Sequence, residues 1–361
     1  MQAANKLKKQ LTAAKFAEEV LTWQHQHGRH DLPWQQPATP YRVLVSEIML
    51  QQTQVSTVIP YFQRWMQALP TLEALASANE DEVMALWQGL GYYSRARNLQ
   101  KAARYIVHEL NGKFPEELES IQKIPGVGRY TAGAIRSFAY DTYGPIVDGN
   151  VRRLFCRIFG IEGPPTSSAV NKELWQYAET LTPEQNNRRF AQGLLDLGAT
   201  LCTKRNPSCQ DCPFASSCVA FQEQRITELP NPKAKKAIPT KIGHFLWIEN
   251  LENNSLRLVK RPNKGIWASL WSLPEVSEKP LEAELKGSFK HVFSHYKLEA
   301  KVWAMTSANV EIMNHLEEAN PEYQLPTDAV ADLENSKTLN SLGLPTPIRA
   351  FIETHWQTKA E

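Results

Sequence analysis

Four of the five cysteines in this 361-residue sequence lie within one 17-residue window, at Cys202, Cys209, Cys212 and Cys218. Six, two and five residues separate them in turn. Four thiolates so close in sequence are a typical ligand set for a metal centre, and the short loops between them must fold around whatever they bind. This window therefore constrains the local fold more tightly than any other part of the sequence.

The spacing favours an iron–sulfur cluster over two alternatives. Zinc sites usually present two short Cys-x2–4-Cys pairs, whereas intervals of six, two and five suit a larger four-iron centre, [4Fe-4S]. Disulfides fit least well, because no apolar run near Met1 would direct the chain to an oxidising compartment, and we expect a cytoplasmic protein. The fifth cysteine, Cys156, lies in an apolar helical pattern and is expected in the core.

The length indicates two domains, because 361 residues exceed what one hydrophobic core usually organises. Hydrophobic residues make up 42% of the chain, but no apolar stretch approaches the roughly 20 residues of a membrane helix, so we expect no membrane association. The net charge of +2 is too small to attract a polyanion by itself. Any nucleic acid must therefore meet a local basic surface.

The hydrophobic periodicity changes along the chain. From Leu11 to about Phe221 apolar residues recur at helical spacing, which predicts an all-α domain over residues 1–224. Residues 225–241 are rich in proline and lysine, which is typical of an extended basic linker. Alternating apolar residues at 244–248 and 256–259 predict strands, so residues 242–361 are expected to form a smaller α+β domain.

A second chemical signal is the sequence Ile-Pro-Gly-Val-Gly-Arg-Tyr-Thr-Ala-Gly at residues 124–133. Gly126 and Gly128 separate two helical runs and predict a tight hairpin, whose free N–H groups at the next helix start can bind a DNA phosphate. An ordinary helix–helix turn would have the same pattern. Because the hairpin stands upstream of the four cysteines, however, the chain resembles the helix-hairpin-helix DNA glycosylases of the endonuclease III superfamily.

Members of that superfamily place a catalytic aspartate downstream of the hairpin, and Asp148 stands there in Ile-Val-Asp-Gly-Asn-Val. A helix start would favour its charge, although a purely structural N-cap would occupy the same place. Members that also cleave the DNA backbone carry a lysine directly after the Gly-Arg pair, where its amine forms a Schiff base with the sugar. Here that residue is Tyr130, which predicts base removal without strand cleavage.

A second carboxylate, Glu47, lies in the otherwise apolar helical pattern Ser-Glu-Ile-Met-Leu-Gln-Gln-Thr-Gln-Val at residues 46–55. Such a setting raises a pKa and suits a general acid, although a glutamate on a solvated helix face is the alternative. This string is similar to the catalytic segment of the MutY adenine DNA glycosylases. So are Gly-Leu-Gly-Tyr-Tyr-Ser-Arg-Ala-Arg-Asn-Leu at residues 89–99 and Asp-Leu-Pro-Trp at residues 31–34, and the resemblance spans most of Leu21 to Cys218.

The resemblance implies roles for particular residues. Glu47 would protonate adenine at N7 and later help to activate water, while Asp148 would stabilise the sugar cation and Tyr130 would stand in place of the lyase lysine. Gln52 and Tyr92 would enter the duplex opposite the flipped base, and Leu32, Trp34 and Gln192 would line the adenine pocket. Core packing is the alternative for Tyr92 and Trp34, and a helix surface is the alternative for Gln192.

The distal domain provides an independent comparison. Residues 261–274 resemble the opening of a Nudix-like fold, but the acidic helix that binds metal in Nudix hydrolases does not follow them, so this domain should bind rather than hydrolyse. In the MutY family it recognises 8-oxoguanine opposite the adenine. The matching loop is Phe293-Ser294-His295, for which an ordinary strand with an incidental hydroxyl and imidazole is the alternative.

The resemblance therefore implies an adenine DNA glycosylase that acts, as a monomer, on double-stranded DNA with A:8-oxoguanine or A:G mispairs. His30 and Gln35 depart from the basic residues of some relatives, which puts contacts near the adenine pocket in doubt. Two other classes stay open. An endonuclease III-type pyrimidine glycosylase and lyase shares the hairpin and cysteines but requires lysine at position 130, and a non-catalytic iron–sulfur DNA-binding protein leaves Glu47 and Asp148 without a purpose.

Overall fold

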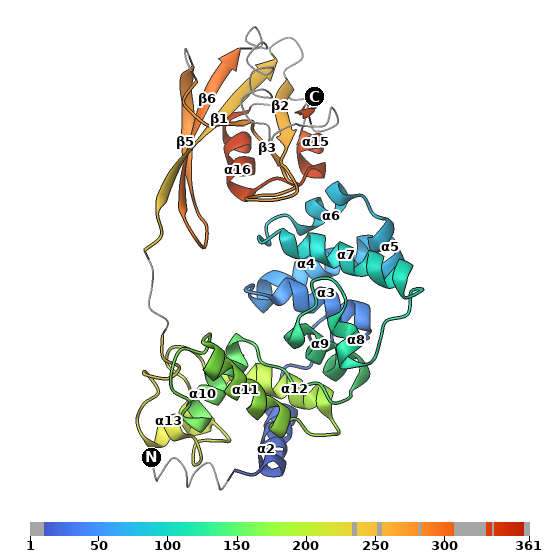
Figure 1. Cartoon of the computed structure of the whole chain (residues 1–361), viewed down its shortest axis with the longest axis vertical. Helices are drawn as coiled ribbons and strands as arrows, with labels where there is room; N and C mark the ends of the chain where they lie inside the picture. The colour runs from blue at the N-terminus through green and yellow to red at the C-terminus, as the bar shows by residue number, and fades with distance from the viewer. Residues whose placement is uncertain are drawn as a thin grey trace. The chain divides into compact units, whose positions relative to one another are not determined.

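A computed structural model describes residues 11–232, 237–250, 255–280, 283–306, 330–333 and 336–356. By its contacts the chain divides into two compact units, one formed by Met1–Ala76 with Lys101–Lys235 and the other by Ser77–Gln100 with Lys236–Glu361. The linker lysines Lys233, Lys235 and Lys236 lie outside the described residues. Figure 1 traces the elements along the chain.

The helical reading of the first part of the chain is confirmed, and side-chain caps explain several of the helix starts. Thr12 and Thr39 accept hydrogen bonds from backbone N–H groups in the first turns of α2 and α3, and Ser167 does the same for α11. The helices are α2 (Ala13–His27), α3 (Pro40–Leu50), α4 (Val55–Ala68), α5 (Leu72–Ser77), α6 (Glu80–Trp87), α7 (Ser94–Glu109), α8 (Leu118–Gln122), α9 (Arg129–Ile135), α10 (Gly149–Phe159), α11 (Ser168–Leu181), α12 (Asn187–Asp196) and α13 (Val219–Gln222).

An aromatic cluster joins α2, α10 and α12 to the cysteine window. Phe16 stacks on Phe214 with ring centroids 4.6 Å apart, and it also meets Phe155 and Phe190 edge-on. All four rings are buried, and Phe214 lies between the third and fourth cysteines of the window. The cysteine loop is therefore anchored in the core of the first unit. Cys156 is fully buried, as its apolar pattern predicts.

The predicted hairpin forms between α8 and α9. Gly126 has φ +78°, a left-handed conformation that favours glycine, and Gly128 is the exposed N-cap of α9. A third glycine, Gly133, allows the segment before α10 to pass against α9, because a Cβ there would collide with the carbonyl oxygen of Pro145. This close approach brings Asp148, at the start of α10, toward the helix that carries Tyr130.

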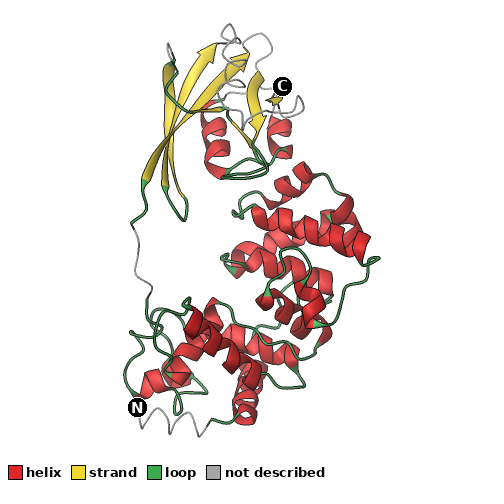
Figure 2. Cartoon of the chain, viewed as in Figure 1, coloured by secondary structure: helices red, strands yellow, loops and turns green. Residues whose placement is uncertain are grey.

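The second unit contains the predicted α+β fold, drawn with its strands in yellow in Figure 2. Its sheet has the order β3-β2-β1-β6-β5, with β4 pairing with β1 and β7 with β2. Only β1 and β6 run parallel among the described pairs. The elements are β1 (Thr240–Asn250), β2 (Ser255–Lys260), β3 (Trp271–Ser272), β4 (Glu275–Val276), β5 (Glu284–Val292), β6 (Lys297–Thr306), β7 (Val330–Leu333), α15 (Ser336–Ser341) and α16 (Thr346–His355).

Alternation along β1 sends neighbouring side chains to opposite faces of the sheet. Phe245 and Trp247 join the large buried cluster that includes Phe351 of α16, whereas Leu246 packs with Trp303 on the other face. Each face therefore has an apolar layer. Among the described residues, no helix combines the length and apolar character needed to cross a membrane.

Candidate active site

Glu47 occupies the middle of α3 with only 3% of its surface exposed. The hydroxyl of Tyr130 donates a hydrogen bond to its Oε2 at 2.7 Å. Burial raises the pKa of Glu47 to about 7; the Tyr130 hydrogen bond lowers it and the nearby charge of Asp148 raises it. Glu47 is therefore a carboxylic acid for much of the time at neutral pH, when an ordinary glutamate is fully ionised.

Asp148 caps α10 with both of its oxygens engaged. Oδ1 accepts the backbone N–H of Val151 at 2.7 Å, and Oδ2 accepts the side-chain amide of Asn150 at 3.1 Å. Burial raises the pKa of Asp148, while the backbone N–H groups of Val151 and Asn150 lower it by less. The donors at the helix start favour the charge as the sequence predicts, but desolvation is the larger effect, which the sequence did not indicate.

The two carboxyl groups differ in ways that suit different chemistry. Among the described residues Glu47 accepts one side-chain hydrogen bond, from a phenol, whereas Asp148 accepts a backbone N–H and a side-chain amide. The charge of Asp148 also helps to keep the proton on Glu47. A buried acid beside a hydrogen-bonded carboxylate can protonate a leaving group and stabilise the positive charge left behind.

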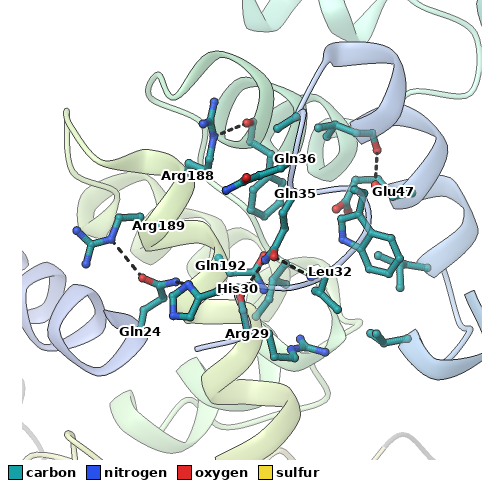
Figure 3. Close-up of a pocket in the computed structure, with 18 residues that line it drawn as sticks. Gln24, Arg29, His30, Leu32, Gln35, Gln36, Glu47, Arg188, Arg189 and Gln192 are labelled. Atoms are coloured by element: carbon teal, nitrogen blue, oxygen red, sulfur yellow. Dashed lines mark hydrogen bonds between the residues drawn. The ribbon is translucent and has the colours of Figure 1, made fainter. Parts of the chain in front are cut away.

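A pocket of about 250 Å³ opens against Glu47. Leu32, Trp34 and Gln192, which the resemblance places at an adenine pocket, all line it and are all buried. Figure 3 shows Glu47 at one side of this pocket and Arg188 at the other. The volume is somewhat smaller than the sites that hold drug-sized ligands, and it suits a compact planar group.

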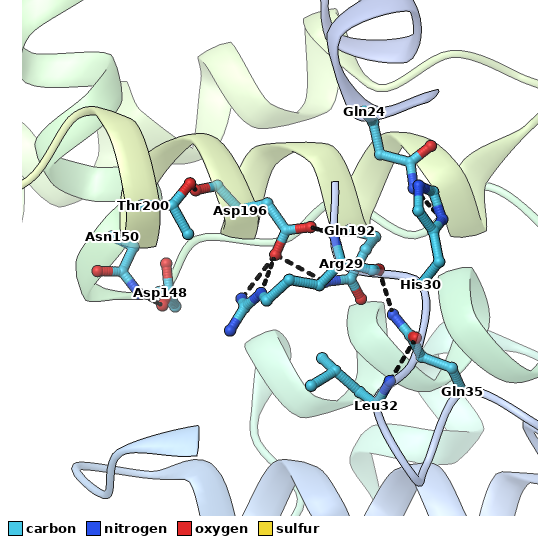
Figure 4. A network of polar contacts seen from close by, with 10 residues as sticks. All are labelled: Gln24, Arg29, His30, Leu32, Gln35, Asp148, Asn150, Gln192, Asp196 and Thr200. Atoms are coloured by element: carbon cyan, nitrogen blue, oxygen red, sulfur yellow. Dashed lines mark hydrogen bonds and ion pairs between the residues drawn. The ribbon is translucent and has the colours of Figure 1, made fainter. Parts of the chain in front are cut away.

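The sequence reasoning missed two residues here: Arg29, which lines this pocket, and Asp196, which contacts Arg29. Asp196 at the end of α12 is fully buried, and it accepts hydrogen bonds from Arg29 and from Gln192 (Figure 4). A single carboxylate within the apolar helical pattern Phe190, Leu194 and Leu197 was an available signal, the same one that identified Glu47. Arg29 carried no such signal, because it lies in a polar loop.

Cys202 and Cys218 of the cysteine window both contact Arg157 of α10. Cys202 and Cys218 are buried, and Cys209 and Cys212 are partly buried. Burial raises the pKa of Cys212 to about 12, and the charges of Cys202, Cys218 and Cys209 contribute to the rise. The guanidinium of Arg157 donates to Cys202 Sγ at 3.4 Å, which places a positive charge where thiolates would need one.

Four cysteine thiolates are the donor chemistry that a four-iron cluster takes. In the part of the chain that the structure describes, no three His, Cys, Asp or Glu side chains form a group that could hold a metal ion. Arg153 links the cysteine window to the start of α10. Its guanidinium donates to the carbonyl oxygen of Cys202 at 2.8 Å and to Asn150 Oδ1 at 2.9 Å.

Comparison with known proteins decides the family. Residues 45–180 match the HhH-GPD superfamily of base excision DNA repair proteins, and residues 244–354 match the NUDIX domain. The chain is 36% identical to the adenine DNA glycosylase of Buchnera aphidicola subsp. Schizaphis graminum over 357 residues, which cover 95% of this chain and 99% of that protein. The chain belongs to the adenine DNA glycosylase family. The adenine DNA glycosylase of Rattus norvegicus is 38% identical, with 80% of this chain and 70% of that protein covered.

Solved structures agree with this placement among the DNA glycosylases. A thermostable thymine-DNA glycosylase superposes with a TM-score of 0.53 at 29% identity, covering 61% of this chain and 99% of that one. A trapped endonuclease III–DNA covalent intermediate has a TM-score of 0.51 at 21% identity, which shows the fold alone, with 59% and 99% covered. The resemblance drawn from the motifs is confirmed, and the chain is a DNA N-glycosylase of the base excision repair class.

Residues that the family resemblance assigns to DNA contact are exposed in this glycosylase. Tyr92 is 54% exposed with φ +47°, and Gln52 is exposed with φ +57°. Left-handed backbone is uncommon for such side chains and persists where the surrounding structure imposes it, often at functional sites. Gly126 and Gly128 are exposed as well, and a Cβ on Gly128 would meet no atom within 4 Å. The hairpin therefore leaves room for a phosphate.

Phe293, Ser294 and His295 lie in the turn that joins β5 to β6, closed by a hydrogen bond from the Phe293 N–H to the Tyr296 carbonyl at 2.9 Å. Ser294 and His295 are exposed, while Phe293 packs against Trp267 with ring centroids 5.3 Å apart. Ser294 Oγ and His295 Nδ1 lie 3.4 Å apart. The turn thus presents one hydroxyl and one imidazole to solvent on an aromatic support.

Proposed function

We propose that this glycosylase removes adenine from double-stranded DNA where it is mispaired with 8-oxoguanine or guanine. The observation that carries the proposal is Glu47: a buried acid with a pKa of about 7, on the wall of a pocket and next to a second carboxylate. Adenine excision needs a proton donor at the base and a negative charge at the sugar, and these two side chains supply both.

In the proposed mechanism the adenine is flipped out of the duplex into the pocket lined by Leu32, Trp34 and Gln192. Glu47 protonates N7, so that the base leaves as a neutral molecule when the N-glycosidic bond breaks. The ionised Asp148 stabilises the oxocarbenium sugar left behind. The Glu47 carboxylate then takes a proton from water as that water adds to the sugar carbon, which restores the acid.

Strand cleavage is not part of the proposal. Lyase chemistry requires an amine that attacks the sugar and forms a Schiff base, and residue 130 is a tyrosine whose hydroxyl donates to Glu47. Burial raises the pKa of Tyr130 well above its usual value, so it stays protonated as a donor. We therefore propose a monofunctional enzyme that leaves an abasic site.

The remaining residues are proposed to hold the duplex. Gly126 and Gly128 would bind a phosphate through the backbone, and Gln52 and Tyr92 would fill the space left by the flipped base, Tyr92 by stacking. The Phe293-Ser294-His295 turn would read 8-oxoguanine on the opposite strand. These roles suit the exposure of each residue, and double-stranded DNA is the proposed partner of the monomeric protein.

We propose that Cys202, Cys209, Cys212 and Cys218 hold a [4Fe-4S] cluster with a structural role. When bound, the cluster would order the loop that carries the exposed Lys204 and Arg205, whose charges can meet DNA phosphates. The division into a glycosylase domain at residues 1–224, a linker at 225–241 and a lesion-recognition domain at 242–361 is part of the same proposal. So is action in the cytoplasm.

The proposal is tested by Glu47→Gln, which keeps the shape of the side chain but removes its acid. We expect adenine release to fall by at least the roughly 10²–10⁴ of one general acid, with duplex affinity retained. Glu18→Gln is the matched control, because Glu18 is exposed on α2 and lies outside the pocket. Near-normal single-turnover release by Glu47→Gln would remove Glu47 from the mechanism.

A further inference from the structure

Asp196 is a buried carboxylate that the proposed mechanism does not use. It is fully buried, and its two oxygens accept hydrogen bonds from two residues that line the pocket, Arg29 and Gln192 (Figure 4). Arg29 donates through its backbone N–H at 2.8 Å and through Nε at 2.7 Å, and its Nη2 lies 2.6 Å from Oδ1. Gln192 donates through Nε2 to Oδ1 at 2.9 Å.

The contact with Gln192 settles the orientation of its amide. An ionised carboxylate can only accept hydrogen bonds, so the end of Gln192 that faces Asp196 must be the NH2 group. Arg29 forms an ion pair with this buried carboxylate, in a site where an unpaired charge would be costly. The carbonyl oxygen, which has no hydrogen-bond partner among the described residues, is the group that Gln192 has left for the pocket it lines.

Which end of the amide faces the base matters for specificity. Adenine carries an exocyclic N6 amine, which donates, whereas guanine and hypoxanthine carry an oxygen at that position, which only accepts. An acceptor held in the pocket therefore attracts adenine and repels a 6-oxopurine. A freely turning glutamine would serve either base equally well.

We propose that Asp196 is a positioning residue for base selection: by holding the NH2 group of Gln192 and the guanidinium of Arg29, it presents the Gln192 carbonyl oxygen to the N6 amine of adenine. This inference rests on the proposed function. Asp196 itself touches neither the base nor the sugar. Its effect reaches the substrate through Gln192, so it should appear as a change in the preference between bases.

The test uses Asp196→Asn, which keeps the size of the side chain. Its carboxamide can donate to the Gln192 oxygen, so the Gln192 amide is free to turn its NH2 group to the base. Single-turnover release is measured from duplexes with adenine, purine or hypoxanthine opposite 8-oxoguanine, where purine lacks the amine and hypoxanthine replaces it with oxygen. Comparing the same three substrates between wild type and variant cancels the intrinsic leaving ability of each base.

We expect the preference for adenine over purine and over hypoxanthine to fall by about 5- to 150-fold, the range of one base-edge contact. A residue that only stabilised the fold would slow all three substrates by a common factor. Equal slowing, with the ratios unchanged, would overturn the inference. If wild type released no base from any of these duplexes, the proposed function would fail instead.

A second pair of variants keeps the test decisive if Asp196→Asn does not fold. Gln192→Met removes the acceptor and should lose the preference for adenine over purine. In Gln192→Glu a protonated carboxyl group can donate a hydrogen bond to Asp196 through its O–H and present its carbonyl oxygen, an acceptor, to the base. This variant should therefore retain the preference for adenine over purine. A methionine variant that discriminates as well as wild type, or a glutamate variant that does not discriminate, would contradict the role assigned to the oxygen.

Discussion

The hydrogen bond between Tyr130 and Glu47 makes a prediction about pH dependence. The phenol donates to the charged form of Glu47, so it lowers the pKa of that carboxyl group, against burial, to about 7. Tyr130→Phe removes the donor and leaves the burial. The pKa of Glu47 should therefore rise, and because the protonated form is the catalytic acid, activity should persist to higher pH.

The size of the shift follows from the geometry. The Tyr130 hydroxyl lies 2.7 Å from Glu47 Oε2, the length of a charge-assisted hydrogen bond, and such a bond contributes about 1.5–3 kcal/mol. At about 1.36 kcal/mol for each pKa unit, its loss raises the pKa of Glu47 by roughly 1–2 units. Starting from about 7, the acid should then titrate near pH 8–9.

The measurement is the single-turnover rate of adenine release across pH. For wild type the rate should fall as pH rises through about 7, because Glu47 loses its proton there. For Tyr130→Phe the fall should begin one to two units higher. Tyr105→Phe is the control, because Tyr105 lies on α7 and does not line the pocket. An alkaline limb that stayed in place or moved to lower pH would refute the assignment of Glu47 as the acid.

Two further predictions concern the cysteines and the lesion. Cys209→Ser should lose bound iron and its brown colour, and should weaken duplex binding; unchanged folding and affinity without iron would argue against a structural cluster. The double change Ser294→Ala, His295→Ala should leave adenine release from an A:G duplex roughly intact and erase most of the preference for A:8-oxoguanine, a loss of about 1–3 kcal/mol. An unchanged preference would place lesion reading elsewhere, and equal losses on both duplexes would reduce the turn to a DNA anchor.

Local patterns in the sequence were sufficient for much of the fold and for the chemistry of the site. The hairpin was predictable because Gly126 and Gly128 separate two helical runs, and the structure confirms a left-handed Gly126 between α8 and α9. Glu47 stood out as a charge within an apolar pattern, and it is buried. These features depend on neighbours within a few turns of chain, which is the distance over which periodicity carries information.

Features that depend on distant segments could not be predicted in the same way. Arg29 and Asp196 are 167 positions apart, and only the packing of the chain brings them together. The parallel pairing of β1 with β6 likewise joins segments that β2 to β5 separate in the sequence. The pKa of Asp148 depends on how completely the folded protein excludes water. Its position at a helix start predicts a lowered pKa, whereas burial, which raises the pKa, is the larger effect.

The most direct test of the account is incubation of the full-length protein with a labelled duplex carrying one adenine opposite 8-oxoguanine, analysed with and without subsequent alkali. The account predicts release of free adenine and an intact strand, which breaks at the abasic site only after alkali, because Tyr130 cannot form a Schiff base. Strand breaks without alkali would contradict the monofunctional mechanism. Absence of adenine release, from protein that binds the duplex, would contradict the central claim that Glu47 and Asp148 form an adenine-excising site.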